Sequence, residues 1–267
     1  MSHPNFSPAR HPVNPVLADS LPIIRSILNH DRAWSLYALG DLAPAEQGHC
    51  EWRYSQNDPR AVTLFYRAFD PAIFFASGPA PAVEALLDEA PLPSNLYLHI
   101  RPDLVAIVSD RYHRVTTKRM LRMILEQPAL VDPAGPERIG VNDLNDLVQL
   151  YICRSAAEKD GTFFLPAQVA DGIYFGIREH GRLVAVAGTH LINRAESAAA
   201  IGNVYCRPDH RGQGLGSRVT SAVVDALVRE GIQTIGLNVG PDNPAASLYR
   251  RLGFREVCEY VEGTAER

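Results

Sequence analysis

The sequence has few cysteines, and their spacing suits neither a metal site nor a disulfide framework. Four cysteines occur among 267 residues, and no two of them are separated by only two residues. Structural zinc sites and small disulfide-bonded domains use close cysteine pairs. We therefore expect no bound metal and a protein of the reducing cytoplasm. The cysteines are Cys50, Cys153, Cys206 and Cys258.

An excess of positive charge is also absent. The formal net charge is −4 and the calculated pI is about 6.1, so the sequence has no electrostatic feature that would attract nucleic acid or an anionic membrane. No apolar run approaches the length of a membrane-spanning helix. The first residues, Met1-Ser2-His3-Pro4-Asn5, lack the basic and apolar segments of an export signal. We expect no nucleic-acid partner, no membrane partner and no export.

The sequence does contain enough apolar residues for two domains of ordinary size, since 46% of its 267 residues are hydrophobic.

The most informative segment is Arg211-Gly212-Gln213-Gly214-Leu215-Gly216. It follows a mostly apolar strand expected over residues 198–206 and opens an amphipathic helix that Gly231 should end. Glycines let the backbone bend and bring N–H groups close to an anion, and the helix adds its positive dipole end. This arrangement suits a pyrophosphate.

Three simpler or different interpretations of this segment compete. An ordinary tight turn would be favoured if the glycines stood alone. A dinucleotide-binding fold requires G-x-G-x-x-G, but position 219 is valine. A P-loop requires a Gly-Lys pair, and none follows the turn.

A second motif, Asn243 to Phe254, favours a binding role for the glycine turn over an ordinary tight turn. Asn243 is a good N-cap, Pro244 suits the first helical position, and Gly253 suits the left-handed residue beyond the helix. Between the two helices, apolar residues alternate with others over residues 234–239, which is the period of a strand. The order strand, glycine turn, helix, strand, short helix is therefore expected.

Taken together, R-x-x-G-x-G followed by N-x-x-A-x-x-L-Y-x-x-L-G-F resembles the GCN5-related N-acetyltransferase (GNAT) superfamily over residues 137–262. The resemblance implies an α/β (α+β) fold with a mixed, mostly antiparallel sheet flanked by helices. It also implies acetyl-CoA as co-substrate. Its pyrophosphate would lie on the turn and its pantetheine arm along the preceding strand. The cofactor-binding residues so implied are Val204, Tyr205, Cys206, Arg211, Gly212, Gln213, Gly214, Leu215, Gly216, Ser217 and Asn243.

The same resemblance implies that Tyr249 protonates the departing thiolate. Each assignment has a structural alternative: Tyr249 packing at the end of a short helix, Asn243 acting only as a cap, and Arg211 lying on the surface. Cys206 is expected to be a small apolar strand residue, because nothing nearby in sequence would lower its pKa.

The general base is less well defined. His190, near the end of an expected strand over residues 183–191, is the first candidate, with a structural histidine as an equal alternative. Glu179 lies at the expected hairpin tip 179–182 and suits a solvated turn residue better. A chain of waters is a third route for the proton. A helix over residues 141–152 and the residues that follow it, 154–164, should border the acceptor pocket.

The first half of the sequence is also predicted to contain a mixture of helices and strands. We expect helices at 17–28, 33–42, 82–89 and 103–111 and strands at 62–68, 73–76 and 96–100. Ser77-Gly78-Pro79-Ala80-Pro81 precedes one of these helices, and its prolines lack the N–H donors that a pyrophosphate needs. Residues 1–130 therefore suit a degenerate, non-catalytic GNAT-like copy, or else an unrelated α/β domain. Residues 116–125 and 127–136 should join it to a GNAT domain over 137–267.

The predicted function is acetyl transfer to an amine of a small molecule or amino acid. Direct attack in a ternary complex is favoured, because no Cys–His or Ser–His pair suggests an acyl-enzyme. The alternative is a non-catalytic acyl-CoA-binding sensor or scaffold that uses the same turn. The protein is expected to be a monomer or a homodimer.

Overall fold

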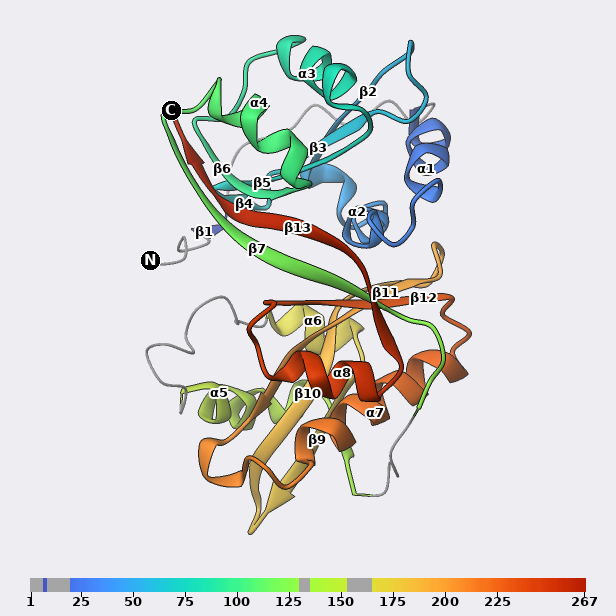
Figure 1. Cartoon of the computed structure of the whole chain (residues 1–267). Helices are drawn as coiled ribbons and strands as arrows, with labels where there is room; N and C mark the ends of the chain where they lie inside the picture. Colours follow the sequence, from blue (N-terminus) through green and yellow to red (C-terminus); the bar gives the residue numbers. More distant parts are fainter. Residues whose placement is uncertain (1–6, 9–19, 130–134, 153–164) are drawn as a thin grey trace. The chain divides into compact units, whose positions relative to one another are not determined.

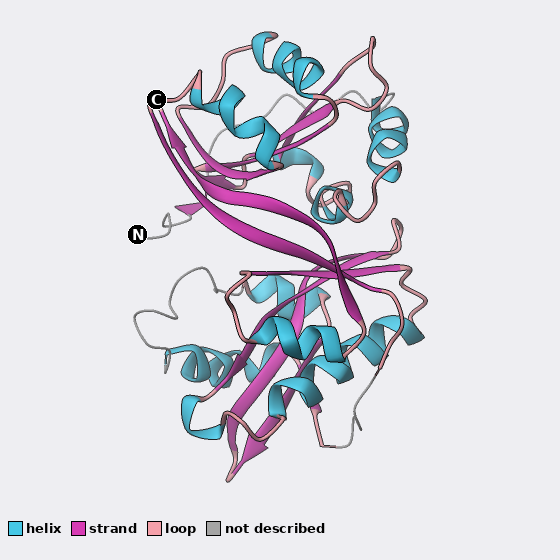
Figure 2. Cartoon of the chain, in the orientation of Figure 1, coloured by secondary structure: helices cyan, strands magenta, loops and turns pink. Residues whose placement is uncertain are grey.

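The chain forms two compact units in the computed structural model, which describes residues 7–8, 20–129, 135–152 and 165–267. One unit contains Met123–Glu256, here called the C-terminal unit. The other, the N-terminal unit, contains the described residues up to Arg122 together with Val257–Arg267. Both units are mixed α/β structures in which helices flank a sheet (Figure 2).

The C-terminal unit holds a sheet in the order β7-β12-β11-β10-β9-β8. The neighbours from β8 to β11 pair antiparallel, whereas β11 and β12 pair parallel. Its elements, coloured yellow-green to red in Figure 1, are β8 (Glu137–Ile139), η4 (Val141–Asp143), α5 (Leu144–Ile152), α6 (Pro166–Asp171), β9 (Tyr174–Glu179), β10 (Arg182–Asn193), β11 (Ala198–Cys206), η5 (Pro208–His210), α7 (Leu215–Arg229), β12 (Thr234–Val239) and α8 (Ala245–Arg251).

Local sequence signals account for many of these boundaries. The β9–β10 hairpin turns at His180 and Gly181, whose φ angles of 50° and 77° suit a two-residue turn of the mirror-image type. Gly231 (φ 76°) and Gly253 (φ 96°) are the left-handed residues that follow α7 and α8. The expected strand at 198–206, the hairpin tip and both glycine helix stops are therefore confirmed.

The N-terminal unit holds a sheet in the order β2-β3-β5-β6-β13-β7. Here β2, β3 and β5 pair antiparallel, β5 and β6 pair parallel, and β13 pairs antiparallel with β6. The elements are α1 (Leu21–Asn29), α2 (Leu36–Gly40), η2 (Gln47–His49), β2 (Cys50–Tyr54), β3 (Val62–Tyr66), β5 (Ala72–Ser77), α3 (Ala80–Asp88), β6 (Asn95–Ile100), η3 (Pro102–Leu104), α4 (Val105–Ser109) and β7 (Arg114–Leu125), with a small separate sheet of β1 (Ser7–Pro8) and β4 (Phe69–Asp70).

Both units contain the same succession of elements: two helices, an antiparallel run of three strands, a helix and a parallel fourth strand. The boundary between them differs from the expected one. Residues 116–125, expected to be a connection, belong to strand β7, and β13 (Phe254–Glu266) continues past the C-terminal unit into the N-terminal sheet. The register Val261↔Ile100 to Glu266↔Asn95 fixes that last strand. Residues 257–267 therefore pack with the N-terminal unit, because β13 supplies backbone partners for β6.

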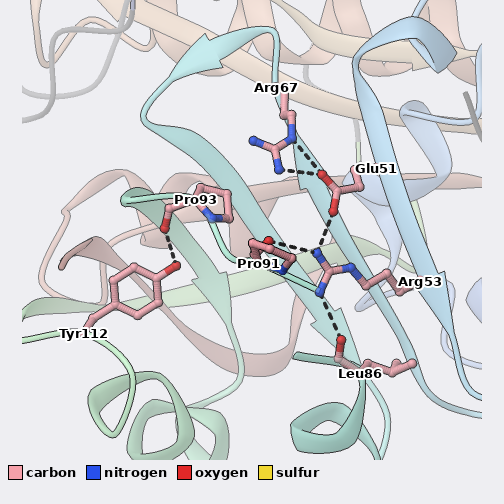
Figure 3. Close-up of polar contacts among 7 residues, drawn as sticks. All are labelled: Glu51, Arg53, Arg67, Leu86, Pro91, Pro93 and Tyr112. Carbon is pink, nitrogen blue, oxygen red and sulfur yellow. Dashed lines mark hydrogen bonds and ion pairs between the residues drawn. The ribbon is translucent and has the colours of Figure 1, made fainter. Parts of the chain in front are cut away.

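A buried arginine closes the end of α3 in the N-terminal unit (Figure 3). The Arg53 side chain is 8% exposed and donates to the Leu86 carbonyl at 3.1 Å and to Glu51 Oε1 at 2.6 Å. Arg67 Nε donates to the other Glu51 oxygen at 2.8 Å. Although burial opposes it, these hydrogen bonds from Arg53 and Arg67 hold the pKa of Glu51 below its ordinary value.

Replacing Arg53 with methionine should lower the free energy of unfolding by about 3 kcal/mol, because a buried carbonyl and a carboxylate lose their shared donor. Chemical denaturation followed by circular dichroism measures this. Arg60→Met is the matched control, since Arg60 is 64% exposed in its ion pair with Asp58. Its loss should be much smaller than that of Arg53→Met, because solvent screens an exposed ion pair. Equal losses for the two variants would contradict the role assigned to Arg53.

Candidate functional site

Strand β11 extends beyond its pairing with β12. The parallel pairing of the two strands runs only from Ala198↔Thr234 to Ile201↔Leu237. On its other side, β11 stays paired with β10 as far as Cys206. A strand that continues past its neighbour in this way is the kind of edge to which an extended ligand can add. The predicted residues Val204, Tyr205 and Cys206 form the end of this edge.

A bulge gives this edge its shape. The register with β10 passes from Val186↔Tyr205 to Gly188↔Gly202, so β11 carries an extra residue between these pairs. Asn203 lies in the bulge in the left-handed region, with φ 55°. Its carbonyl accepts a hydrogen bond from the Tyr151 hydroxyl at 2.5 Å. The bulge is thus held from α5 as well as from β10.

The glycine turn that follows is exposed and left-handed at two positions. Gly212 and Gly214 have φ angles of 78° and 77°, and Gly214 is the N-cap of α7, which has no side-chain cap. A Cβ at either position would meet no atom within 4 Å among the described residues. The two glycines are therefore required by backbone conformation, and open space lies above them. The N–H groups at the start of α7 and the positive end of the helix dipole suit this position for binding an anion.

Two contacts join this turn to its surroundings. Arg211 Nε donates to the carbonyl of Cys206 at 3.1 Å, and its guanidinium lies 5.8 Å from the centre of the Tyr205 ring. His210 lies between Asp209 and Glu179, with distances of 2.8 Å and 3.2 Å from its two ring nitrogens. Glu179 is exposed, as expected of a turn residue, and its carboxylate lies next to His210, so the hairpin tip contacts the turn. This pairing leaves Glu179 less suited to be a base.

Helix α8 approaches the first turn of α7. A Cβ on Gly216 would lie 3.4 Å from Leu248 Cδ1, so the two helices are close at that point. Asn243 Oδ1 accepts from the N–H of Ala245 at 2.9 Å, which makes it the capping side chain, although the helix begins one residue later than expected, with Pro244 as N-cap. Tyr249 is 7% exposed and packs edge-on against Phe254, with ring centres 6.2 Å apart.

His190 lies at a second bulge, on β10, between the pairs Thr189↔Ile201 and Leu191↔Ala200. Its residue surface is exposed, yet protein atoms crowd the ring enough for desolvation to lower the pKa of His190 below its ordinary value. Gln168 Nε2 donates to the His190 carbonyl at 2.8 Å and lies 3.5 Å from Nδ1. Desolvation of the ring therefore favours its neutral form.

Comparison with known proteins decides the family. Residues 144–254 match the acetyltransferase (GNAT) family. The C-terminal unit belongs to the GNAT superfamily. Over 103 residues, 37% of this chain, it is 37% identical to mycothiol acetyltransferase of Pseudarthrobacter chlorophenolicus. Over 83 residues, 31% of this chain, it is 34% identical to [ribosomal protein bS18]-alanine N-acetyltransferase of Escherichia coli K12. The aligned regions are 31% and 54% of those proteins, so the chain spans less than two thirds of either.

The fold of the whole chain resembles solved tandem GNAT structures. A tandem GNAT protein from the clavulanic acid biosynthesis pathway aligns with a TM-score of 0.56 over 98% of each chain, at 15% identity. The described fold is thus two tandem GNAT-like units, as expected from the sequence. At this identity the likeness concerns the fold alone.

The N-terminal unit lacks the features of the GNAT cofactor turn. A Cβ on Gly78, which has φ 119°, would lie 2.6 Å from Ala61 Cα, so backbone fills the space that is open above Gly212 and Gly214. Helix α3 starts after Pro79, which has no N–H to offer. The Trp34 indole donates to the Ala76 carbonyl at 3.0 Å, beyond the last β5–β6 pair, Phe75↔His99. In the N-terminal unit, a side chain of the protein thus occupies the position just beyond the parallel strand pairing.

The structure brings the predicted cofactor residues together on the end of β11, the glycine turn and the start of α7, with α8 beside them. Residues 154–164, expected to border the acceptor pocket, lie outside the described residues. The sequence analysis did not identify Tyr151, Gln168, Tyr174 and Asn203 as residues that shape the site. The polar Asn203 within an otherwise apolar strand was a signal that could have identified this position.

Across the described ranges, no group of three metal-ligating side chains occurs and no helix is long and apolar enough to cross a bilayer.

Proposed function

We propose that this protein is an acetyl-CoA-dependent N-acetyltransferase that acts on an amine of a small molecule or amino acid. The observation that carries the proposal is that β11 runs on to Cys206, past its pairing with β12, and is followed by the exposed left-handed turn at Gly212 and Gly214. Such a site matches a ligand with an amide-bearing arm and a pyrophosphate end. The scattered cysteines favour the cytoplasm as its location.

The cofactor would be held mostly by main-chain groups. The pantetheine amides would pair with the edge at Val204, Tyr205 and Cys206, and the pyrophosphate would receive N–H groups from residues 212–217. Arg211, tied by Nε to the end of β11, would add positive charge at the rim of the turn. Asn243 would contact the cofactor while it caps α8.

In the proposed reaction, the neutral amine nitrogen attacks the thioester carbonyl carbon. The carbon–sulfur bond then breaks, and the Tyr249 hydroxyl gives its proton to the departing sulfur. His190, whose neutral form is favoured by desolvation, takes the proton that the amine loses. Burial raises the pKa of the Cys206 thiol, with Arg211 opposing, so Cys206 is protonated and does not form an acyl-enzyme. Transfer is therefore direct, within a ternary complex.

Isothermal titration calorimetry with acetyl-CoA tests the cofactor site. We expect one molecule of acetyl-CoA per chain, because the N-terminal unit fills the equivalent edge with Trp34 and the equivalent turn with Ala61. A stoichiometry of two would contradict this account of the N-terminal unit. No binding at all would overturn the proposed function.

Release of free CoA across a panel of amines, amino acids and peptides tests the transfer step. Turnover with a small amine is the expected result. Turnover only with a peptide N-terminus would move the acceptor class to proteins, as in the relative whose name specifies an alanine of ribosomal protein bS18. Tight acetyl-CoA binding with no turnover on any acceptor would favour a non-catalytic sensor.

A further inference from the structure

Asn203, the bulged residue of β11, is joined by hydrogen bonds to two helices of the C-terminal unit. Its main-chain carbonyl accepts from the Tyr151 hydroxyl of α5 at 2.5 Å. Its side-chain Nδ2 donates to Gln168 Oε1 of α6 at 3.3 Å and to the Tyr174 hydroxyl of β9 at 2.6 Å. One residue of the strand proposed to bind the pantetheine arm is therefore attached to α5 through its backbone and to α6 through its side chain.

Burial makes these attachments specific. Asn203 and Tyr151 are each 6% exposed, and Tyr174 is fully buried. A buried polar group that loses its partner is costly, so each hydrogen bond holds its two groups in one arrangement. The left-handed backbone of Asn203, with φ 55°, directs the side chain and the carbonyl to different partners. The conformation of the bulge thus depends on α5 and α6 as well as on the β10 ladder.

Gln168 has a second attachment that does not involve β11. Its Oε1 accepts from the main-chain N–H of Leu165 at 3.0 Å, which fixes the oxygen on that side and requires the amino group of Asn203 to face it. Its Nε2 donates to the His190 carbonyl on β10 at 2.8 Å. Helix α6 is therefore held by β10 even where the bond to Asn203 is absent, and the Asn203 bond is the part that depends on the end of β11.

A ligand that adds to the end of β11 holds the backbone that carries these bonds. We propose that Asn203 is a positioning residue through which acetyl-CoA bound along β11 stabilises α5 and α6, by way of the Tyr151–Asn203 and Gln168–Asn203 hydrogen bonds. A ligand that binds better to the conformation in which these bonds are formed must favour their formation. This inference rests on the proposed cofactor site and specifies how α5, the helix predicted to border the acceptor pocket, responds to the cofactor.

Hydrogen–deuterium exchange of the full-length protein, with and without saturating acetyl-CoA, measures the two helices separately. Peptides that cover residues 144–152 and 166–171 should exchange about 2- to 10-fold more slowly with acetyl-CoA, which is the effect of one net hydrogen bond on a local opening equilibrium. Calorimetry on the same sample sets the concentration at which the site is filled. Bound acetyl-CoA with unchanged exchange in both helices would overturn the coupling.

Two substitutions should separate the two routes. Asn203→Gly removes the side-chain bonds, while glycine keeps the left-handed backbone and the carbonyl, so α6 should lose its response to acetyl-CoA and α5 should keep it. Tyr151→Phe removes the hydroxyl that meets this carbonyl, so α5 should lose its response and α6 should keep it. The same reduction of both responses in both variants would indicate a general loosening and would overturn the two separate routes.

Ser197→Gly is the matched control. Ser197 has a left-handed backbone, with φ 51°, directly before β11. Its hydroxyl donates to the Gly231 carbonyl at 3.2 Å and accepts from the N–H of Gln233 at 2.9 Å, so this variant also loses two side-chain hydrogen bonds. It should leave the responses of both helices at their wild-type size. Loss of the α6 response in this variant as well would overturn the role of Asn203.

Binding and exchange together separate this inference from the proposed function. If the wild type does not bind acetyl-CoA, the proposed function is overturned and this inference falls with it. If acetyl-CoA binds and transfer proceeds without any response of α5 and α6, only this inference is overturned. With an acceptor that is turned over, Tyr151→Phe should raise the acceptor KM several-fold and change the acetyl-CoA KM less. The opposite split would contradict a role for Tyr151 on the acceptor side.

Discussion

Replacing Tyr249 with phenylalanine should slow acetyl transfer by about 10²- to 10⁴-fold, the usual contribution of a positioned proton donor. The substitution removes only the hydroxyl that we propose protonates the departing sulfur. The ring is 7% exposed and packs on Phe254, so phenylalanine should occupy the same space. Affinity for acetyl-CoA, measured by calorimetry, should change little. Steady-state release of CoA gives the rate.

The matched control removes a tyrosine hydroxyl from the other unit. Tyr112 is buried, and its hydroxyl donates to the Pro93 carbonyl at 2.7 Å (Figure 3). Tyr112→Phe should cost about 1 kcal/mol of stability and leave turnover unchanged. If Tyr249→Phe turned over at the wild-type rate, the proton would reach sulfur by another route and the acid assignment would be wrong. An equal fall in both variants would point to a general loss of folded protein.

Signals within a few residues of each other predicted the cofactor site. Gly214 had to be glycine because the N-cap of α7 is left-handed, and Gly253 because its φ is positive and a Cβ there would meet the Gln127 carbonyl at 1.8 Å. The alternation of residues in β12 and the cap at Asn243 are likewise local. These capping and turn constraints act between neighbours in the chain, so they can be read without the tertiary fold, whereas the approach of Gln127 to Gly253 is a tertiary contact that only the structure shows.

The parts that the sequence did not predict depend on distant partners. Strand β2 was not predicted from the sequence, because it carries the charged residues Glu51 and Arg53. Glu51 accepts hydrogen bonds from Arg53 and from Arg67, and Arg67 reaches it only once the sheet forms. The continuation of β13 into the N-terminal sheet depends on backbone pairing with β6, which no local pattern encodes. The Gln168–Asn203 contact joins residues 35 positions apart in the chain. For His190, the local pattern predicted the strand but not the bulge that displaces the residue.

Substituting the two turn glycines with alanine should weaken acetyl-CoA binding by about 10- to 100-fold at each position. Alanine disfavours the left-handed backbone at Gly212 and Gly214, so the turn would relax and redirect its N–H groups. Losing one hydrogen bond to a charged phosphate costs about 1.5–3 kcal/mol, which corresponds to that change in the dissociation constant. Calorimetry with acetyl-CoA measures the affinity, and thermal unfolding without ligand measures the strain.

The chain offers two controls with the same backbone strain and no place in the site. Gly181 and Gly231 have φ angles of 77° and 76°, and a Cβ on either would also meet nothing within 4 Å in the described part of the chain. All four alanine variants should therefore lose about 1–2 kcal/mol of stability. Only those at 212 and 214 should lose affinity for acetyl-CoA. Equal affinity in all four would mean that the phosphates bind elsewhere, because strain alone cannot distinguish these positions.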